Sequence, residues 1–480
     1  MYELSKSCVK VTNSYVTDFF SIKLGVKQGD NLSPNLFKLF INDLPEYMKN
    51  SIDPIVLNNN PINCLLYADD LVLLSTSATG LQSRLNKLKQ YCNDWCLTVN
   101  PNKTKVLVFN KAGKYINEKL DYDNNIVECV QHYKYLGLQF SASGTFSFAQ
   151  SELYKKSLKA YYKLHKDLLS LNPSIHTSIH VFDHTIKPIL LYGCEIWGSF
   201  NTNTAKFRNG NVSLDKIYQN LKCESLHIKF CKSILGVHSK SSNFGALSEL
   251  GRFSLQYDII KAMINYLYHL NNLKTSFPIL QDAFETSKNL FLSKKSSWYG
   301  AMQTLLENMP EIRNLYSTSA SLQTFRNKSK ALLKSKFVEL WYKKLEEQKD
   351  GKLRTYIKMK SNYGREKYLS ILNNFEQRRS LTNFRISCHH LKIETGRYQG
   401  TLPQDRICAR CSSGEVEDES HFLFDCAKLN EDRNILLQII SQHCSNFNNL
   451  YSINKLIWLM NSEEHPVLSA TAKFISKNIN

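Results

Sequence analysis

Two adjacent carboxylates, Asp69 and Asp70, interrupt two short and largely apolar runs, residues 63–66 and 71–74. Runs of this length with a break between them predict two buried strands joined by a tight hairpin that carries both acids at its tip. Paired acids beside a buried hairpin are costly unless a cation neutralises them, and carboxylate oxygens are the ligands that Mg²⁺ prefers. Two such ions can stabilise the attacking and leaving oxygens of an in-line phosphoryl displacement. The pair therefore indicates two-metal chemistry, although acids also cap ordinary turns.

A second set of residues that could hold a metal stands near the end of the chain. Cys408 and Cys411 are followed by His421 and Cys426 with the spacing C-x2-C-x9-H-x4-C. Thiolate and imidazole ligands joined by short loops are typical of a structural Zn²⁺ site in which the protein fills every coordination position. The spacing predicts a zinc knuckle, and the alternative is three buried thiols and a surface histidine.

The residues before the acidic pair predict a helix. Ser33 and Pro34 open a pattern that keeps apolar residues on one face as far as Leu44. Ser33 suits the N-cap of this helix and Pro34 its first position. Gln28 and Gly29 stand directly before it, where a glycine lets the backbone approach a substrate closely. The alternative for Gly29 is a simple turn.

The residues after the acidic pair predict a second helix and then a strand. Apolar residues recur at helical spacing from Leu81 to Trp95, which is typical of an amphipathic helix packed on a sheet, and Asn100-Pro101 is expected to end it. Lys103 follows at the start of the strand-like residues 104–109. The alternative for Lys103 is a solvated lysine in a turn.

These segments stand in the order and at the distances of the later palm motifs of one enzyme family. Together with Tyr135-Leu136-Gly137 downstream, they resemble the reverse transcriptase of non-LTR (LINE-like) retrotransposons. The cysteine and histidine residues of the tail are similar to the C-terminal zinc-knuckle region of the same proteins. The resemblance implies an RNA-directed DNA polymerase, a nucleotidyltransferase that copies an RNA template from a DNA primer or target.

The resemblance also implies a role for each motif. Asp69 is the expected Mg²⁺ ligand, with Asp70 as its neighbour and second candidate. Lys103 is expected near the nucleotide phosphates, where it could neutralise or protonate the pyrophosphate leaving group. The residues expected beside the template base and the nucleotide are Gln28, Gly29, Tyr67 and Ala68. The residues expected to grip the primer are Tyr135, Leu136 and Gly137.

One part of the family pattern is missing from the sequence. The family takes a further metal-binding aspartate from an earlier palm strand, several tens of residues before Gln28. The residues that precede Gln28 contain no such motif, and Asp18 matches instead the strand pair that leads into the glycine segment. We therefore expect a chain that begins inside the palm, without the fingers or an endonuclease, and that is inactive by itself. Whether it is an enzyme stays open.

The composition favours polyanionic partners. The 480 residues carry 61 basic and 42 acidic side chains, a net charge of +19, which suits nucleic acid first and an anionic membrane surface second. No apolar run approaches the ~20 residues of a transmembrane helix, and the N-terminus does not resemble a signal peptide. Thirteen cysteines without a secretory signal indicate a reducing compartment. We expect an intracellular protein, a nuclear or cytoplasmic ribonucleoprotein, that is not secreted.

The most basic part of the chain is the segment 326–367. It carries fourteen Lys or Arg residues against five acids, with aromatic residues among them. The aromatic residues are Trp341, Tyr342, Tyr356 and Tyr363. Such a mixture suits phosphate contacts together with base stacking, and a solvated helix face is an equally good interpretation.

The sequence as a whole predicts an α+β fold with a partial palm, a mostly helical thumb and C-terminal region, and a small zinc knuckle. The expected domains are a partial palm (1–140), a thumb-like helical region (141–200), a basic helical connection (201–385) and a knuckle-containing domain (386–480). One functional interpretation is RNA-templated DNA synthesis by the intact parent protein, with Mg²⁺ in the palm and Zn²⁺ in the tail. The alternative is a non-enzymatic, basic nucleic-acid-binding remnant or domesticated host factor.

Overall fold

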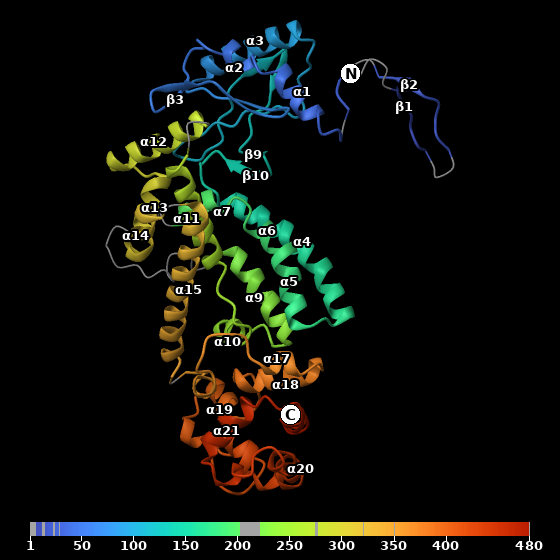
Figure 1. Cartoon of the computed structure of the whole chain (residues 1–480), viewed down its shortest axis with the longest axis vertical. Coiled ribbons are helices and arrows are strands. Elements are labelled where there is room, and N and C mark those ends of the chain that lie inside the picture. Colours follow the sequence, from blue (N-terminus) through green and yellow to red (C-terminus); the bar gives the residue numbers. More distant parts are fainter. Residues whose placement is uncertain are drawn as a thin grey trace. The chain divides into compact units, whose positions relative to one another are not determined.

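The structure is a computed structural model of the whole chain (Figure 1). The chain divides into two compact units. The described residues are 6–11, 15–22, 25–27, 29–201, 221–273, 277–319, 321–349 and 351–479. The first unit comprises Met1–Tyr135, Phe140–Gly144 and Lys274–Leu292, and the second comprises Leu136–Gln139, Thr145–Leu273 and Ser293–Asn480. Gln28, a residue of the predicted site, lies outside the described residues.

The described strands pair two by two in antiparallel hairpins. The strands of the first unit are β1 (Lys6–Ser7), β2 (Phe20–Ser21), β3 (Ile55–Leu57), β4 (Asn60–Ile62), β5 (Cys64–Tyr67), β6 (Asp70–Leu73), β7 (Leu120–Tyr122), β8 (Asn125–Val127) and β9 (His132–Tyr135). Strand β10 (Leu138–Ser141) follows β9 and pairs with it. The other pairs are β1–β2, β3–β4, β5–β6 and β7–β8.

Helix α3 holds the core of the first unit together. The helices of this unit are α1 (Ser33–Phe40), α2 (Leu44–Tyr47), α3 (Ala78–Asp94) and α12 (Pro278–Leu292). One side of α3 packs against α2 and β5 in a cluster formed by Leu44, Met48, Cys64, Leu88, Tyr91 and Cys92. Its Leu85 side chain packs in a second cluster with Val106, Leu120, Val127 and Cys129. The β5–β6 hairpin is therefore fastened to the unit through α3.

The predicted helix between Leu81 and Trp95 is confirmed as α3. Its N-cap is Ser77, whose hydroxyl oxygen accepts a hydrogen bond of 3.0 Å from the Gly80 N–H. The helix ends at Asp94, so the expectation that Asn100-Pro101 ends it is wrong. The following strand is also absent from the described residues 104–109, where Val106 forms only an isolated bridge with Cys129.

The predicted helix that opens near Ser33 is confirmed as α1, but its cap is not. Leu32 occupies the N-cap position, and Ser33 lies inside the helix. The Ser33 hydroxyl donates a hydrogen bond of 2.6 Å to the Lys27 carbonyl oxygen. It therefore does not cap the helix, because a cap accepts hydrogen bonds from the first N–H groups of the helix. The Asp30 carboxylate accepts from the Leu32 N–H instead, at 3.1 Å.

The described part of the second unit is mostly helical, as the sequence predicts beyond residue 140. Its first helices are α4 (Ser147–Leu171), α5 (Ile175–Thr185), α6 (Lys187–Leu190), α7 (Cys194–Trp197), α9 (Lys222–Leu235), α10 (Asn243–Glu249) and α11 (Gln256–Asn271). The central helices are α13 (Trp298–Glu307), α14 (Pro310–Thr318), α15 (Leu322–Glu346), α16 (Tyr356–Met359) and α17 (Tyr368–Ile371). The last are α18 (Phe375–Arg385), α19 (Lys392–Thr395), α20 (Asn430–Ser441), α21 (Ser452–Met460) and α22 (His465–Asn478). None of the described helices combines the length and apolar character of a membrane span.

A buried ion pair ties several of these helices together. Arg385 of α18 and Glu249 of α10 are both fully buried, and the arginine Nε donates to both carboxylate oxygens at 3.1 and 3.2 Å. The same guanidinium donates to Glu366 at 2.5 Å and to the Met460 carbonyl at the end of α21 at 2.7 Å. Removing one partner would leave a buried charge unpaired, so this contact fixes how the helices pack.

Candidate functional site

Both members of the acidic pair stand at an exposed hairpin tip. In the β5–β6 register Tyr67 is paired with Asp70, so Ala68 and Asp69 form a two-residue turn. Tyr67, Ala68, Asp69 and Asp70 are all exposed, whereas the strand residue Cys64 is buried. The predicted hairpin with acids at its tip is therefore confirmed. The prediction that both of its strands are buried is wrong, because Cys64 is the only buried residue of β5 and β6.

The turn has a backbone conformation that alanine rarely adopts. Ala68 has φ +52°, in the left-handed region, where a Cβ atom costs about 1–2 kcal/mol. The first position of a two-residue hairpin turn is often glycine for this reason. The hairpin therefore holds a strained residue directly before Asp69, and such residues occur often at functional sites.

Strand β9 runs close to both the acidic pair and the lysine segment. The Tyr133 hydroxyl donates a hydrogen bond of 3.1 Å to the Lys103 carbonyl oxygen. Burial raises the pKa of Tyr135, and the negative charge of Asp70 raises that pKa further. Because alternate residues of a strand share one face, one face of β9 reaches both Lys103 and the surroundings of Asp70.

The other predicted residues of this region occupy turns. Lys103 is exposed in a turn, and its N–H donates to the Asn100 side chain at 3.3 Å. Gly29 has φ +88°, and nothing lies within 4 Å of the position that a Cβ would take. The left-handed backbone by itself requires glycine here, which agrees with the simple-turn interpretation.

Tyr192, a residue that the sequence did not single out, holds the turn between β9 and β10. Leu136 and Gly137 form this turn with φ +46° and +83°. The Tyr192 hydroxyl donates a hydrogen bond of 2.8 Å to the Leu136 carbonyl, and a Cβ at Gly137 would lie 3.3 Å from the Tyr192 ring. The side-chain indole of Trp197 donates in turn to the Tyr192 carbonyl at 2.8 Å. In the sequence, the aromatic and glycine residues that follow Pro188 were the one feature that could have pointed to this contact.

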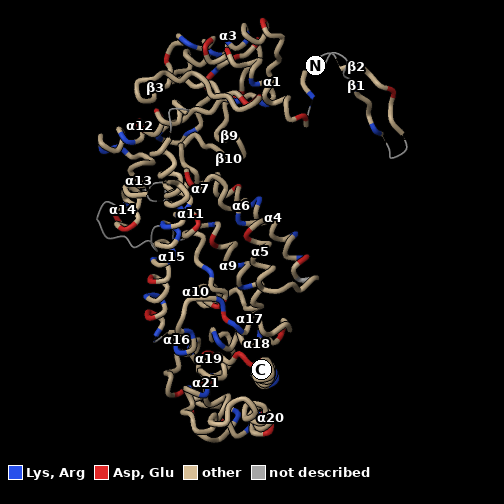
Figure 2. Tube along the Cα trace, in the orientation of Figure 1, with Lys and Arg blue, Asp and Glu red and all other residues tan. Residues whose placement is uncertain are grey.

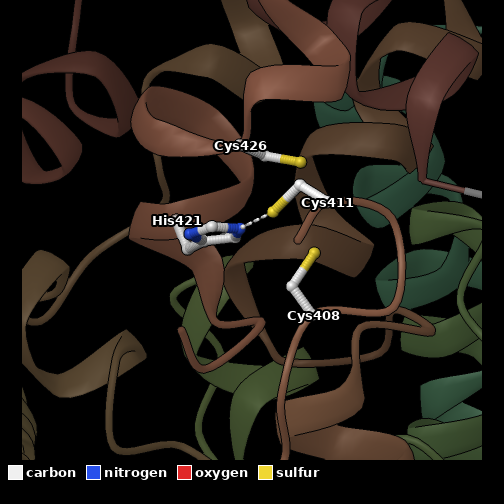
Figure 3. Close-up of side chains that lie close together, drawn as sticks. All are labelled: Cys408, Cys411, His421 and Cys426. Carbon is white, nitrogen blue, oxygen red and sulfur yellow. Dashed lines mark hydrogen bonds between the residues drawn. The ribbon is translucent and has the colours of Figure 1, made fainter. Parts of the chain in front are cut away.

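The predicted zinc ligands converge on one point (Figure 3). The ligand atoms of Cys408, Cys411, His421 and Cys426 all lie within 4.8 Å of one another. The Cys411 sulfur lies 3.4 Å from the Nε2 atom of His421. Two sulfurs bound to one Zn²⁺ at ~2.3 Å lie about 3.8 Å apart in a tetrahedron. The separations and the donor types therefore fit one Zn²⁺ ion.

Short local elements place these four side chains. An isolated bridge between Ile407 and Val416 reverses the chain, and the Cys408 N–H donates to the Glu415 carbonyl at 2.8 Å. His421 begins a single π-helical turn that ends directly before Cys426. Turns of this kind are frequent at functional sites.

Residues around the cluster orient the histidine and activate a thiol. The Nδ1 atom of His421 lies 3.0 Å from the Glu415 carboxylate, which leaves Nε2 facing the sulfurs. Hydrogen bonds from Ser413 lower the pKa of Cys411 to about 6. Burial raises the pKa of Cys426 to about 11, although a bound Zn²⁺ deprotonates its thiol ligands outright.

No other cluster of this kind is found in the described ranges. Among those residues, no further group of three or more His, Cys, Asp or Glu side chains comes close enough to hold one metal ion. Asp69 and Asp70 therefore have no third carboxylate beside them in the described part of the chain.

Most aromatic residues of the basic segment pack inside the second unit. Trp341 of α15 is 6% exposed, and its indole N–H donates to the Ser248 hydroxyl at 2.7 Å. Tyr356 is fully buried, and the Tyr363 ring stacks on Phe253 with centroids 4.4 Å apart. The interpretation that these rings stack on bases is therefore wrong for Trp341 and Tyr356. Tyr342 is 44% exposed.

Comparison with known proteins finds similarity to one family in the first part of the chain. Residues 2–140 match the family described as reverse transcriptase (RNA-dependent DNA polymerase). The chain is 32% identical over 203 residues to a probable RNA-directed DNA polymerase from transposon BS of Drosophila melanogaster. The matched region covers 40% of this chain and 21% of that protein. The chain is 25% identical over 199 residues to the RNA-directed DNA polymerase from mobile element jockey of the same species, covering 39% of this chain and 20% of that protein.

A third relative is the Pol polyprotein from the type-2 retrotransposable element R2DM of Drosophila melanogaster. It is 33% identical over 131 residues, which cover 25% of this chain and 12% of that protein. The chain thus spans about a fifth of the length of the first two relatives. The matched segment is similar to reverse transcriptase domains, and the predicted resemblance to the non-LTR, LINE-like retrotransposon type is confirmed.

Proposed function

We propose that residues 1–140 are the later part of a polymerase palm that takes part in RNA-templated DNA synthesis within a longer protein. The observation that carries this proposal is the Asp69–Asp70 pair at the exposed tip of the β5–β6 hairpin, inside the segment that matches the family. Because both carboxylates are exposed, metal ions and a nucleotide can reach them. Carboxylates with a purely structural role in an ion pair would not need this access.

Each residue of the proposed site has a task that its chemistry suits. Asp69 and Asp70 would hold Mg²⁺, which when bound would supply positive charge to the reacting phosphate oxygens. Lys103 would neutralise the leaving pyrophosphate, and Gly29 would lie beside the template base. Tyr67 and Ala68 contact the nucleotide. The turn formed by Leu136 and Gly137, with Tyr135, contacts the primer, and the Tyr192 hydroxyl fixes that turn.

The rest of the chain would bind and present nucleic acid. We assign residues 141–200 to a thumb, 201–385 to a basic connection and 386–480 to a domain organised by a structural Zn²⁺. Four protein ligands at the cluster leave no open coordination position, which supports a structural role for the ion. The proposed partners are an RNA template and a DNA primer or target, in a nuclear or cytoplasmic ribonucleoprotein.

A non-enzymatic, nucleic-acid-binding role is the second candidate for residues 1–480 taken alone. It is favoured by the lack of a third carboxylate near Asp69 and Asp70 among the described residues. Two-metal transfer requires ligands on both ions, so the polypeptide of residues 1–480 should bind primed template without extending it.

Primer extension and metal binding together test the proposal. Residues 1–480, given primed RNA, nucleotides and Mg²⁺, should show no sustained extension. The same chain should bind Mn²⁺, a probe for the Mg²⁺ site, and the double substitution Asp69→Asn and Asp70→Asn should weaken that binding. Unchanged Mn²⁺ affinity in the double variant would refute the metal assignment. Robust extension that Asp69→Asn abolishes would confirm the site and contradict the expected inactivity.

A further inference from the structure

Helix α5 carries a row of histidines that neither proposed metal site uses. His176, His180 and His184 follow one another at intervals of four residues, so they lie on one face of the helix. All three are exposed. The opposite face buries Ile175, Ser178, Ile179 and Phe182. The histidine row therefore faces solvent, and the packing of α5 does not depend on it.

The rings of the last two histidines lie close together. The ring centroids of His180 and His184 are 4.0 Å apart, whereas those of His176 and His180 are 6.4 Å apart. The Nδ1 atom of His184 lies 2.8 Å from the His180 carbonyl oxygen. Because a carbonyl oxygen only accepts, Nδ1 carries the proton and Nε2 has a free lone pair, which is the arrangement found in metal-binding histidines.

The acid next to His184 in the sequence is already paired and does not compete for the imidazoles. Asp183, beside His184 in sequence, accepts two hydrogen bonds from Arg252 at 2.7 and 3.0 Å. Its carboxylate also lies 3.3 Å from the Lys187 ammonium. The ligands available on this face are therefore imidazole nitrogens.

Helix geometry limits one ion to two of the three histidines. The helix rises ~1.5 Å per residue, so His176 and His184 are about 12 Å apart along the axis and neighbouring pairs about 6 Å. Two nitrogens bound to one ion at ~2.0–2.1 Å can be no more than about 4.2 Å apart. The row thus offers two overlapping pairs that share His180, and ring proximity favours His180 with His184.

We propose that His180 and His184 chelate one divalent transition-metal ion, Cu²⁺, Ni²⁺ or Zn²⁺, with water in the remaining positions. Imidazole suits these ions, and the expected affinity is highest for Cu²⁺. Mg²⁺, which prefers oxygen ligands, should not compete. This site is independent of the polymerase proposal, because it uses neither the acidic pair nor the tail cluster.

Titration of the full chain, with its tail cluster loaded with Zn²⁺, tests this site. Calorimetric titration with Ni²⁺ should find one site, and His180→Ala should lower its Ni²⁺ affinity by about 10- to 100-fold or more. Mutation of a residue that only supports a metal ligand already costs about 10- to 100-fold in affinity, so loss of a ligand should cost at least as much. His184→Ala should lower the Ni²⁺ affinity similarly, and His176→Ala should leave it nearly unchanged. Cu²⁺ spectra should show coupling to two nitrogens, which His180→Ala removes.

His269→Ala is the matched control. His269 is exposed on helix α11 and has no histidine four residues away on either side. If His269→Ala lowers the Ni²⁺ affinity as much as His180→Ala does, or if neither lowers it, the proposal is wrong. If His176→Ala weakens binding as much as His184→Ala, the assigned pair is wrong.

Discussion

At the scale of single residues, the left-handed backbone of Ala68 sets the shape of the acidic turn. The strain falls on a residue whose side chain is exposed and makes no packing contribution to the core clusters. Local strain of this kind persists only when the flanking strands impose it, and here the β5–β6 ladder does so on both sides. Glycine would keep the same turn without the steric cost.

We expect Ala68→Gly to stabilise the first unit by about 0.5–1 kcal/mol. Relief of the left-handed strain is worth about 1–2 kcal/mol, and the greater freedom of glycine in the unfolded chain offsets part of it. Urea unfolding measures the change. Ala78→Gly, in the first turn of α3, is the control and should destabilise slightly; destabilisation by Ala68→Gly would contradict the strain argument.

The tail ligands give a second prediction at this scale. Cys411→Ser should remove about one Zn²⁺ per chain, because the serine hydroxyl is a poor substitute for a thiolate. A chelator should then unfold the tail and leave the first unit largely intact, since metal binding is much of the local folding energy. Metal analysis and circular dichroism check both effects. Cys444→Ser, remote from the cluster in sequence, should keep its Zn²⁺, and equal loss in both variants would refute the ligand set.

At the scale of elements, a half-buried carboxylate joins α9 to the start of α11. Glu224 of α9 accepts hydrogen bonds from the Leu255 N–H at 2.7 Å and the Ser254 hydroxyl at 2.9 Å, and its other oxygen lies 3.1 Å from His227 Nδ1. Burial raises the pKa of Glu224, but His227 and these donors outweigh burial and lower it. The folded state therefore favours the charged form.

Glu224→Gln should lower stability at pH 7 by about 1–3 kcal/mol and should flatten its dependence on acid. A lowered folded pKa contributes stability that is present above the unfolded value of ~4.3 and is lost as pH falls through the folded pKa. Unfolding measured from pH 6 to pH 3 tests this. Glu376→Gln, which removes an exposed ion pair with Arg379, should change neither stability nor its pH dependence; an identical acid profile in wild type and Glu224→Gln would contradict the assignment.

Elements with strong local signals could be predicted, and those that depend on distant partners could not. The apolar periodicity that predicts α3 and the break that predicts the β5–β6 hairpin both depend on residues close together in the sequence. Both predictions were correct. The prediction that Ser33 caps α1 was wrong because its hydroxyl donates to the Lys27 carbonyl oxygen instead. Residue spacing does not show which of two possible hydrogen-bond partners a hydroxyl takes. The strand expected at residues 104–109 failed because Val106 pairs with Cys129 alone in this stretch.

The basic segment shows the same limit for a site. Its composition fits both base stacking and a packed helix, and only the fold decides between them. On α15 the buried residues recur at strict intervals of four, namely Phe325, Ser329, Leu333, Phe337, Trp341 and Leu345. Four residues turn a helix by about 400°, which is one full turn plus about 40°. Each buried residue is therefore rotated by about 40° around the helix axis from the one before it. The buried stripe winds around the helix, so the sequence does not show one fixed apolar face.

At the scale of the whole molecule, the net charge of +19 is carried in part by exposed side chains of α15. Figure 2 shows basic and acidic residues interspersed along this helix. The exposed basic residues include Arg326, Lys328, Lys330, Lys334 and Lys343. Such charge attracts phosphate without specifying a sequence.

Binding of nucleic acid should therefore weaken steeply with salt. If α15 contacts phosphates, Lys330→Gln combined with Lys334→Gln should reduce the slope of log affinity against log salt by about 1–2, since each neutralised phosphate contributes ~0.9. Fluorescence anisotropy at several salt concentrations measures the slope. Lys428→Gln with Lys473→Gln removes two exposed charges elsewhere and should change the slope less; equal changes would rule out a specific part for α15.

Helix α12 of the first unit comes from far along the chain. Its Asp282 accepts hydrogen bonds from Asn58 and Asn60 at 3.1 and 2.7 Å, and its Thr286 accepts from the Asn58 N–H at 2.8 Å. These contacts join residues 222 to 228 positions apart. A ribosome that adds about 5–20 residues per second releases α12 more than ten seconds after the hairpin turn it covers. The nascent first unit must therefore wait, with its β3–β4 turn uncovered, while the helices between are made.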